Sequence, residues 1–413
     1  MKKINPFLQE ATKIECYEDW EKLCLKPYNP KATSPFTKVR LILMNGTEFE
    51  ANWHSHNFSR HCADNDLRRE LSLIRRREQQ QQKALASLKP IEESVLQHTM
   101  GYEQLAVELT AILAQNVQDN NVKKALEFAL LEDFDHVYRY ANLLELDEGI
   151  KAETLLGEYT EITPARPTIA EHRYPVDEIK NYIDTKADLF TKLTANIITA
   201  AEQQTMNFYM NQANFYKNEL GRKLYTEIAM IEEQHVSQYG SLLDPMATML
   251  ECQLMHEYVE CYLYYSCYED ETDKRIKELY YKFYLEECGH LQKVAKLLKK
   301  YEGKNWEDLF PNGAEFPKLL KFGENKEYIR KVIKETANFT ADKEGYERVD
   351  NLPDSAKFFK YNKGVNKHID GVASHQVIEK HILEYGQDYR YEEAENPIKE
   401  LRDRTKDNTT FAR

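Results

Sequence analysis

The sequence predicts a mainly α-helical protein, whose central part is an antiparallel helical bundle made of three helical hairpins. Three observations support this fold class. Apolar residues recur with the helical period from Pro90 to about residue 300, short polar segments interrupt them, and one interruption is much longer than the others. We expect a small N-terminal β-hairpin before this region and a polar C-terminal extension after it.

The composition narrows the class of protein and its partners. Of 413 residues, 42% are hydrophobic and 30% are charged, and the net charge is −13. This acidic balance argues against nucleic acid or an anionic membrane as the main partner, and no apolar stretch is long enough to predict a membrane span. The seven cysteines contain no C-x-x-C pair, so we expect no disulfide framework, no rubredoxin-type module and a cytoplasmic location.

Residues 1–90 are predicted to form an N-terminal extension. Within it, residues 37–53 are expected to form the β-hairpin, because Asn45-Gly46 is a favoured two-residue turn and β-forming residues flank it. Three histidines that follow are expected in a polar surface loop: His54, His56 and His61. Residues 63–88 predict an exposed lead-in helix.

The predicted helical domain covers residues 91–300 and contains the hairpins 91–148, 178–240 and 246–300. A long, proline-containing connection separates the first two hairpins, whereas only the short GSLLDP segment separates the second and third. Residues 301–413 are predicted to be a polar extension with one helix at 374–386.

Each predicted hairpin carries the same pattern of acids and a histidine. An acid on the apolar stripe of the first helix is followed 30 residues later by a second acid, and three residues further by a histidine. The three sets are Glu103, Asp133 and His136; Glu202, Glu232 and His235; and Glu257, Glu287 and His290. This repetition indicates an internal repeat.

Helix geometry gives the pattern a chemical meaning. In an antiparallel hairpin whose turn lies midway, two residues 30 apart meet at one level, and residues three apart share a helix face. Two facing hairpins therefore supply four carboxylates and two imidazoles, a ligand set suited to two divalent ions such as iron or manganese. Without such a partner, burying these charges would be costly.

With these repeats, residues 91–300 resemble the ferritin-like superfamily, particularly its rubrerythrin-like di-iron carboxylate proteins. The resemblance implies two iron ions, with manganese as the alternative, and an oxidoreductase that reacts with O2 or peroxide. The enzyme class it implies is an oxidase, an oxygenase or a peroxidase acting on an unknown substrate. Tyr209 and Tyr264, each seven residues after the first acid of its hairpin, are similar to family tyrosines that hydrogen-bond a ligand carboxylate, whereas the first hairpin has Thr110.

The chain departs from the family pattern in three ways. Asp133 replaces the usual glutamate, and without a rubredoxin-type domain an external electron donor is needed. There are also three half-sites where the family needs two. The long connection favours pairing hairpins one and two, the tyrosines favour hairpins two and three, and hairpins one and three are a further option.

A different class of function is also compatible with the sequence. The acids could pair with Lys, Arg or His in a non-catalytic helical scaffold or interaction protein that keeps a degenerate metal site. Metal content separates the two hypotheses. We expect neither nucleic acid nor a membrane as a partner and leave a homodimer open.

Overall fold

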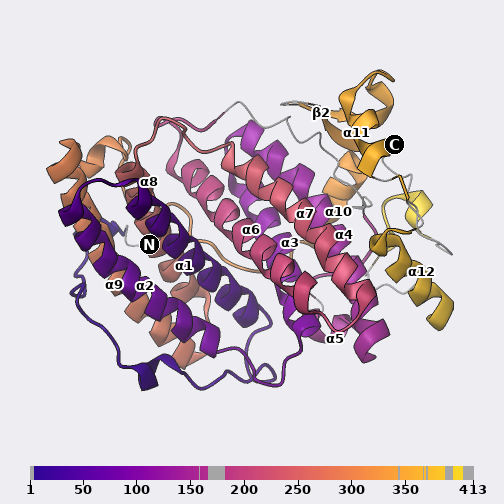
Figure 1. Cartoon of the computed structure of the whole chain (residues 1–413), viewed down its shortest axis with the longest axis horizontal. Coiled ribbons are helices and arrows are strands. Elements are labelled where there is room, and N and C mark those ends of the chain that lie inside the picture. Colours follow the sequence, from indigo (N-terminus) through magenta and orange to yellow (C-terminus); the bar gives the residue numbers. More distant parts are fainter. Residues whose placement is uncertain are drawn as a thin grey trace. The chain divides into compact units, whose positions relative to one another are not determined.

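The computed structural model describes residues 4–157, 159–165, 182–342, 345–365, 367–368, 371–386 and 394–402. These residues are mainly helical, with one pair of short antiparallel strands, which confirms the predicted fold class at this level (Figure 1). Among the described helices, none combines the length and apolarity that crossing a membrane requires.

The six long helices predicted for the three hairpins are all present. The helices are α1 (Phe36–His61), α2 (Asn65–Ser87), α3 (Val95–Asn116), α4 (Asn120–Glu148), α5 (Glu153–Leu156), α6 (Leu189–Phe215), α7 (Glu219–Gly240), α8 (Met249–Asp270), α9 (Lys274–Glu302), α10 (Lys326–Thr336), α11 (Lys357–Val365) and α12 (Ala373–Tyr385). The strands are β1 (Phe339–Asp342) and β2 (Gly345–Arg348).

The chain divides into two compact units. Unit 1 comprises Met1–Glu93, Tyr182–Ala201 and Leu243–Phe322, and it contains the hairpins α1/α2 and α8/α9. Unit 2 comprises Ser94–Asn181, Glu202–Leu242 and Gly323–Arg413, with the hairpin α3/α4, the second part of α6, α7 and the C-terminal elements. Residues 91–300 are thus shared between the two units, and the hairpin predicted at 246–300 lies in unit 1 with α1/α2.

The predicted β-hairpin at 37–53 is wrong, because these residues lie within α1. Its run Val39–Met44, apolar except for Arg40, is buried, and Gly46 lies in the helix interior. A glycine costs a helix only about 1 kcal/mol, whereas each buried aliphatic side chain contributes about 1.5–3 kcal/mol. Tertiary burial therefore outweighs the local turn preference. The histidine-rich stretch continues α1 and is not the predicted loop.

Matching caps mark the hairpins α3/α4 and α8/α9. The second helix of each begins at an aspartate N-cap, Asp119 or Asp273, whose side chain accepts hydrogen bonds from backbone N–H groups of the first turn. Each ends at a glycine, Gly149 or Gly303, with φ of 65° or 72°. Because a left-handed backbone conformation favours glycine, both hairpins end at this residue type.

The C-terminal extension from Gly323 onward belongs to unit 2, whereas its first residues, up to Phe322, belong to unit 1. Its predicted helix at 374–386 is confirmed as α12, and two histidines of this helix, His375 and His381, are buried. The Nε2 atom of His381 lies 2.8 Å from Oε2 of Glu145 in α4. Residues 166–181, which include the later part of the predicted connection and the start of hairpin two, lie outside the described residues, as do residues 403–413.

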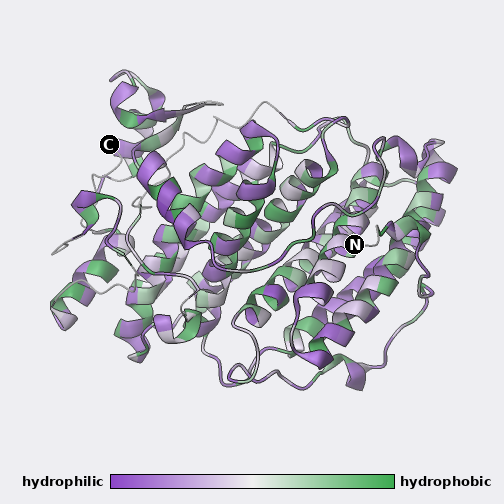
Figure 2. Cartoon of the chain, turned by 180° about the vertical axis from the view of Figure 1, so that it is seen from behind, coloured by the Kyte–Doolittle hydropathy of each residue, from purple (hydrophilic) through white to green (hydrophobic). Residues whose placement is uncertain are grey.

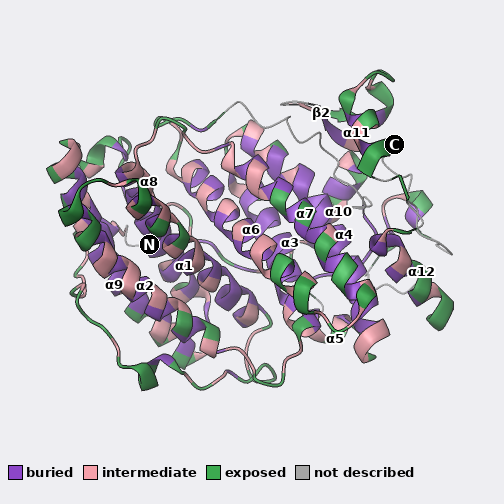
Figure 3. Ribbon diagram, in the orientation of Figure 1, coloured by how far each residue is buried: buried purple, intermediate pink, exposed green. Residues whose placement is uncertain are grey.

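Hydropathy and burial show which parts of the helices face the protein interior. Hydrophobic and hydrophilic residues alternate around the helices, as amphipathic packing requires (Figure 2). Residues of α3 and α4 are buried along most of both helices, so their acids face other helices and not solvent (Figure 3).

Candidate metal centre

In unit 2, four helices bring together six residues that the sequence predicted as metal ligands. All six are buried: Glu103 from α3, Asp133 and His136 from α4, Glu202 from α6, and Glu232 and His235 from α7. They form two overlapping groups in which one potential ligand atom per residue lies within 4.8 Å of the others. The groups are Asp133, Glu202, Glu232 and His235, and Glu103, His136 and Glu232.

Glu232 belongs to both groups and turns one carboxylate oxygen toward each. Its Oε1 lies 3.1 Å from Nδ1 of His136, and its Oε2 lies 3.1 Å from Nδ1 of His235. A carboxylate placed in this way can bridge two cations. The three-residue spacing of Glu232 and His235 on α7 supplies one of these contacts within a single helix turn.

His235 is oriented by a carboxylate outside the predicted ligand set. Its Nδ1 lies 3.2 Å from Oδ1 of Asp133 and 3.8 Å from Oε2 of Glu202, while its Nε2 lies 2.8 Å from Oε2 of Glu132. A carboxylate can only accept, so Glu132 favours a proton on Nε2 of His235, and Nδ1, which faces the acids, is the atom that a metal would bind. Sequence analysis missed Glu132, although it directly precedes Asp133.

Tyr209 contacts the group as a hydrogen-bond donor. Its hydroxyl donates to Oε1 of Glu103, across the unit, and not to Glu202 on its own helix. Its ring also lies near those of Tyr140 and Tyr225, with centroid distances of 5.3 and 5.6 Å. The sequence thus predicted that Tyr209 hydrogen-bonds a carboxylate. The acceptor, however, is Glu103 on the facing hairpin.

Several atoms of the six residues have no hydrogen-bond partner in the described part of the chain. They are Oε2 of Glu103, both carboxylate oxygens of Asp133 and Glu202, and Nε2 of His136. Buried polar atoms are normally satisfied, and several carboxylates facing one another repel. Cations would satisfy these atoms, so the donor set fits a metal centre.

The electrostatics support this fit. Burial, together with the neighbouring carboxylates, raises the pKa of Glu103 and of Glu202 well above the usual value. Burial also opposes ionisation of Glu232, but hydrogen bonds and charges of His136 and His235 lower its pKa. Without cations, the acids compete for too little positive charge to be ionised together.

In unit 1, the alternative half-site Glu257, Glu287 and His290 is buried and meets acids that sequence analysis missed. Two groups lie within the 4.8 Å limit: Glu78, Glu257 and His290, and Glu257, Glu260 and Glu287. Of the open pairings, the structure thus brings together hairpins one and two. Hairpin three instead pairs with α1/α2. The pairing of hairpins one and two is the one that the long connection between them had favoured, whereas the tyrosines had favoured hairpins two and three.

The missed residues did leave a signal in the sequence. Glu48 in α1 and Glu78 in α2 are 30 residues apart, and Gln81 follows three residues later, where the other repeats have histidine. Glu48 was missed because it lay within the predicted β-hairpin. Glu78 was missed because Gln81 stands where the acid-x-x-His pattern requires a histidine. Tyr264, the second predicted tyrosine, donates a hydrogen bond to Glu48.

No family model, curated protein or solved structure matches the chain. Its function is therefore inferred from its own residues.

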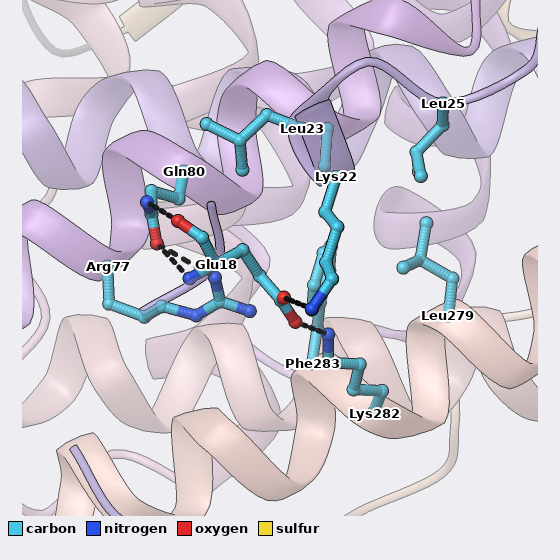
Figure 4. Close-up of a pocket in the computed structure, with 10 residues that line it drawn as sticks. Glu18, Lys22, Leu23, Leu25, Arg77, Gln80, Leu279, Lys282 and Phe283 are labelled. Carbon is cyan, nitrogen blue, oxygen red and sulfur yellow. Dashed lines mark hydrogen bonds and ion pairs between the residues drawn. The ribbon is translucent and has the colours of Figure 1, made fainter. Parts of the chain in front are cut away.

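A pocket of about 280 Å³ lies among the N-terminal segment, α2 and α9 of unit 1. Figure 4 shows Lys22 and Lys282 converging on the carboxylate of Glu18, with Arg77 and Gln80 to the left of it. Arg77 directly precedes Glu78, an acid of the unit 1 groups, in the sequence. Among the described residues that line the pocket, however, none belongs to those groups.

Proposed function

We propose that unit 2 is a ferritin-like four-helix bundle that binds two iron ions, with manganese as the alternative, and that the protein is an oxidoreductase. The observation that carries this proposal is the position of Glu232, whose two carboxylate oxygens face two different histidines. That arrangement divides the six side chains into two sets that share one carboxylate.

The donor set matches the proposed ions. Glu103 and His136 would hold one ion, Asp133, Glu202 and His235 the other, and Glu232 both. Carboxylate and imidazole ligands suit iron and manganese, and each side of the site has one imidazole. When bound, such a pair of ions supplies electron-transfer chemistry toward O2 or peroxide.

The chain's own residues have supporting roles in this proposal. Glu132 holds the proton on Nε2 of His235, so that Nδ1 is free to bind a metal. Tyr209 donates to Oε1 of Glu103 and so restricts the orientation of that carboxylate. The burial of all six ligands excludes bulk water from their surroundings. We propose an external electron donor and an as yet unidentified substrate.

Elemental analysis tests the metal assignment. The full-length protein is stripped with a chelator, loaded anaerobically with Fe(II) and desalted, in parallel with the Glu232→Ala/His235→Ala double variant. We expect the double variant to bind about two fewer iron ions, because the bridging carboxylate and one imidazole are removed. The control is Glu233→Ala, which removes an exposed acid on the same helix.

Unchanged iron content in the double variant would contradict the proposal for unit 2. Absence of bound metal in the wild type after anaerobic loading would support the helical scaffold instead. If the iron is present, ultraviolet absorbance after mixing with O2 or H2O2 tests the redox reaction, since oxidised iron–carboxylate centres absorb in that range. No absorbance change with either oxidant would contradict the oxidoreductase assignment.

A further inference from the structure

Unit 1 repeats the side-chain arrangement of unit 2 at a constant offset of 55 residues. The α1/α2 residues come 55 positions before their counterparts, and the α8/α9 residues come 55 positions after theirs. The corresponding pairs are Glu48 and Glu103, Glu78 and Asp133, Gln81 and His136, Glu257 and Glu202, Glu287 and Glu232, His290 and His235, and Tyr264 and Tyr209.

The contacts repeat as well as the residues. Oε2 of Glu287 lies 2.8 Å from Nδ1 of His290, and its Oε1 accepts a hydrogen bond from the side-chain amide of Gln81. Glu287 thus faces a histidine and a glutamine, as Glu232 faces its two histidines. The bond from Tyr264 to Glu48 reproduces the one from Tyr209 to Glu103.

The donor chemistry nevertheless differs between the units. Gln81 replaces an imidazole nitrogen by an amide, and Glu260 adds a buried carboxylate where unit 2 has Thr205. Glu260 lies in one group with Glu257 and Glu287. Unit 1 therefore offers five carboxylates and one imidazole, while the six ligand candidates of unit 2 comprise four carboxylates and two imidazoles.

Unsatisfied atoms point to a ligand among these acids. Glu78 is fully buried, and neither of its carboxylate oxygens has a hydrogen-bond partner among the described residues. The same holds for Oε1 of Gln81 and Oε2 of Glu48. An isolated buried carboxylate without partners is expensive to maintain, so an ion that these oxygens bind would offset the cost.

Two neighbouring basic side chains, Arg77 and His256, make their shortest contacts with carboxylates outside the unit 1 groups. The guanidinium of Arg77 makes three contacts of 2.7–2.9 Å with the carboxylate of Glu286. Nδ1 of His256 lies 2.7 Å from Oε2 of Glu50, although its Nε2 lies 3.4 Å from Oε1 of Glu260. An ordinary ion pair with Arg77 therefore does not account for Glu78.

We propose that unit 1 holds a second metal centre, separate from the one in unit 2, which binds two divalent ions and favours manganese(II) more than unit 2 does. The two groups share Glu257 and so divide the donors between two positions. Oxygen-rich sites suit harder cations such as Mn(II), whereas imidazole favours iron and the later metals. Gln253, which donates to Glu257 Oε1 at 2.7 Å, orients that shared carboxylate.

Metal loading of matched variants tests this proposal in the full-length protein. Chelator-stripped protein is loaded with Mn(II) alone, and bound manganese is measured by elemental analysis and electron paramagnetic resonance. The unit 1 variant is Glu78→Gln/His290→Ala, and the unit 2 variant is Glu232→Ala/His235→Ala. We expect each to lose about half of the manganese that the wild type binds, and the combined variant to lose all of it.

The outcomes separate the two centres. Full wild-type manganese content in the unit 1 variant would overturn this proposal, whatever the unit 2 variant does. Loss of manganese only in the unit 1 variant would support it and contradict the function proposed for unit 2. Circular dichroism of each variant establishes that it is folded, and Glu78→Gln alone, a near-isosteric change, serves if the double variant is not.

Competition between metals tests the preference. Each double variant is loaded anaerobically with equal Fe(II) and Mn(II), so that its remaining centre reports its own selectivity. We expect a higher Mn-to-Fe ratio when only unit 1 is intact, and a lower ratio when Gln81→His restores the second imidazole. Gln82→His, the same change at the neighbouring half-buried position, is the control. Equal ratios in the two double variants would overturn the preference.

Discussion

The hydroxyl of Tyr264 in α8 donates a hydrogen bond to Oε1 of Glu48 in α1, across 216 residues of sequence. Tyr209 does the same to Glu103 within unit 2. In both units a phenol from one hairpin thus reaches a carboxylate of the facing hairpin. This repeated contact identifies α1/α2 as the partner of α8/α9, and it shows that the chain contains four versions of the acid-bearing hairpin.

Replacing Tyr209 by phenylalanine should weaken metal binding in unit 2. Tyr209→Phe removes the donor to Glu103, and loss of a group that orients a ligand typically lowers metal affinity about 10- to 100-fold. Anaerobic titration calorimetry with Fe(II) measures the change. The control is Tyr140→Phe, because that buried hydroxyl has no hydrogen-bond partner in the described part of the chain. Equal affinities in both variants would show that Tyr209 acts only by packing.

The buried ion pair between Arg77 and Glu286 should contribute strongly to stability. Glu286→Gln leaves the Arg77 charge buried without its counterion, which typically costs about 3–5 kcal/mol. Urea unfolding measures the loss. Asp66→Asn disrupts an exposed pair with Arg69 on the same helix and should cost less than about 1 kcal/mol. Similar effects in the two variants would contradict this assignment.

Gly289 should tolerate no side chain, because the N-terminal segment crosses α9 at this point. A Cβ atom there would lie 2.4 Å from the backbone oxygen of Thr12, whose N–H donates to the Leu285 carbonyl at 3.0 Å. We expect Gly289→Ala to destabilise the protein by about 1–3 kcal/mol in thermal or urea unfolding. At Gly240 the same change meets open space and should be neutral or stabilising. A neutral effect at Gly289 would mean that the segment moves freely.

The metal-free protein should lose stability as the pH rises from about 5 to 8. Burial, aided by the charge of Glu257, raises the pKa of Glu78 to about 8. The folded state therefore binds the Glu78 proton more tightly than the unfolded state, and this contribution disappears as the pH passes from the unfolded to the folded pKa. We expect a loss of at least about 1 kcal/mol, roughly the equivalent of one pKa unit.

Urea unfolding in the presence of a chelator, at pH 5.5 and pH 8, measures this dependence. Glu78→Gln removes the titrating group, so the variant should lose less stability than the wild type over the same interval. Saturating Mn(II) should also reduce the dependence, because bound cations stabilise the ionised carboxylates. An identical pH dependence in the wild type and Glu78→Gln would exclude Glu78 as its source.

The sequence predicted the helices of all three hairpins, including α3 and α4, which are buried along most of their length. The helices of the three hairpins show a clear apolar period, and each was found. In α1 the run Val39–Met44 is almost wholly buried, so periodicity is lost, and the Asn45-Gly46 pair suggested a turn. The wrong β-hairpin prediction placed Glu48 outside any helix, so the fourth acid-bearing hairpin was not recognised.

By itself, the sequence determined which acids and histidines share a helix face within each of the three predicted hairpins. Helix hydrogen bonds span four residues and side chains recur every 3.6, so the spacing of Glu232 and His235, or of Glu287 and His290, already places each pair on one face. Only the tertiary structure decided which hairpins meet, because contacts such as Tyr264 with Glu48 depend on long-range packing. Hence α1/α2 and α8/α9 form one unit, although both hairpins of the other unit lie between them in sequence.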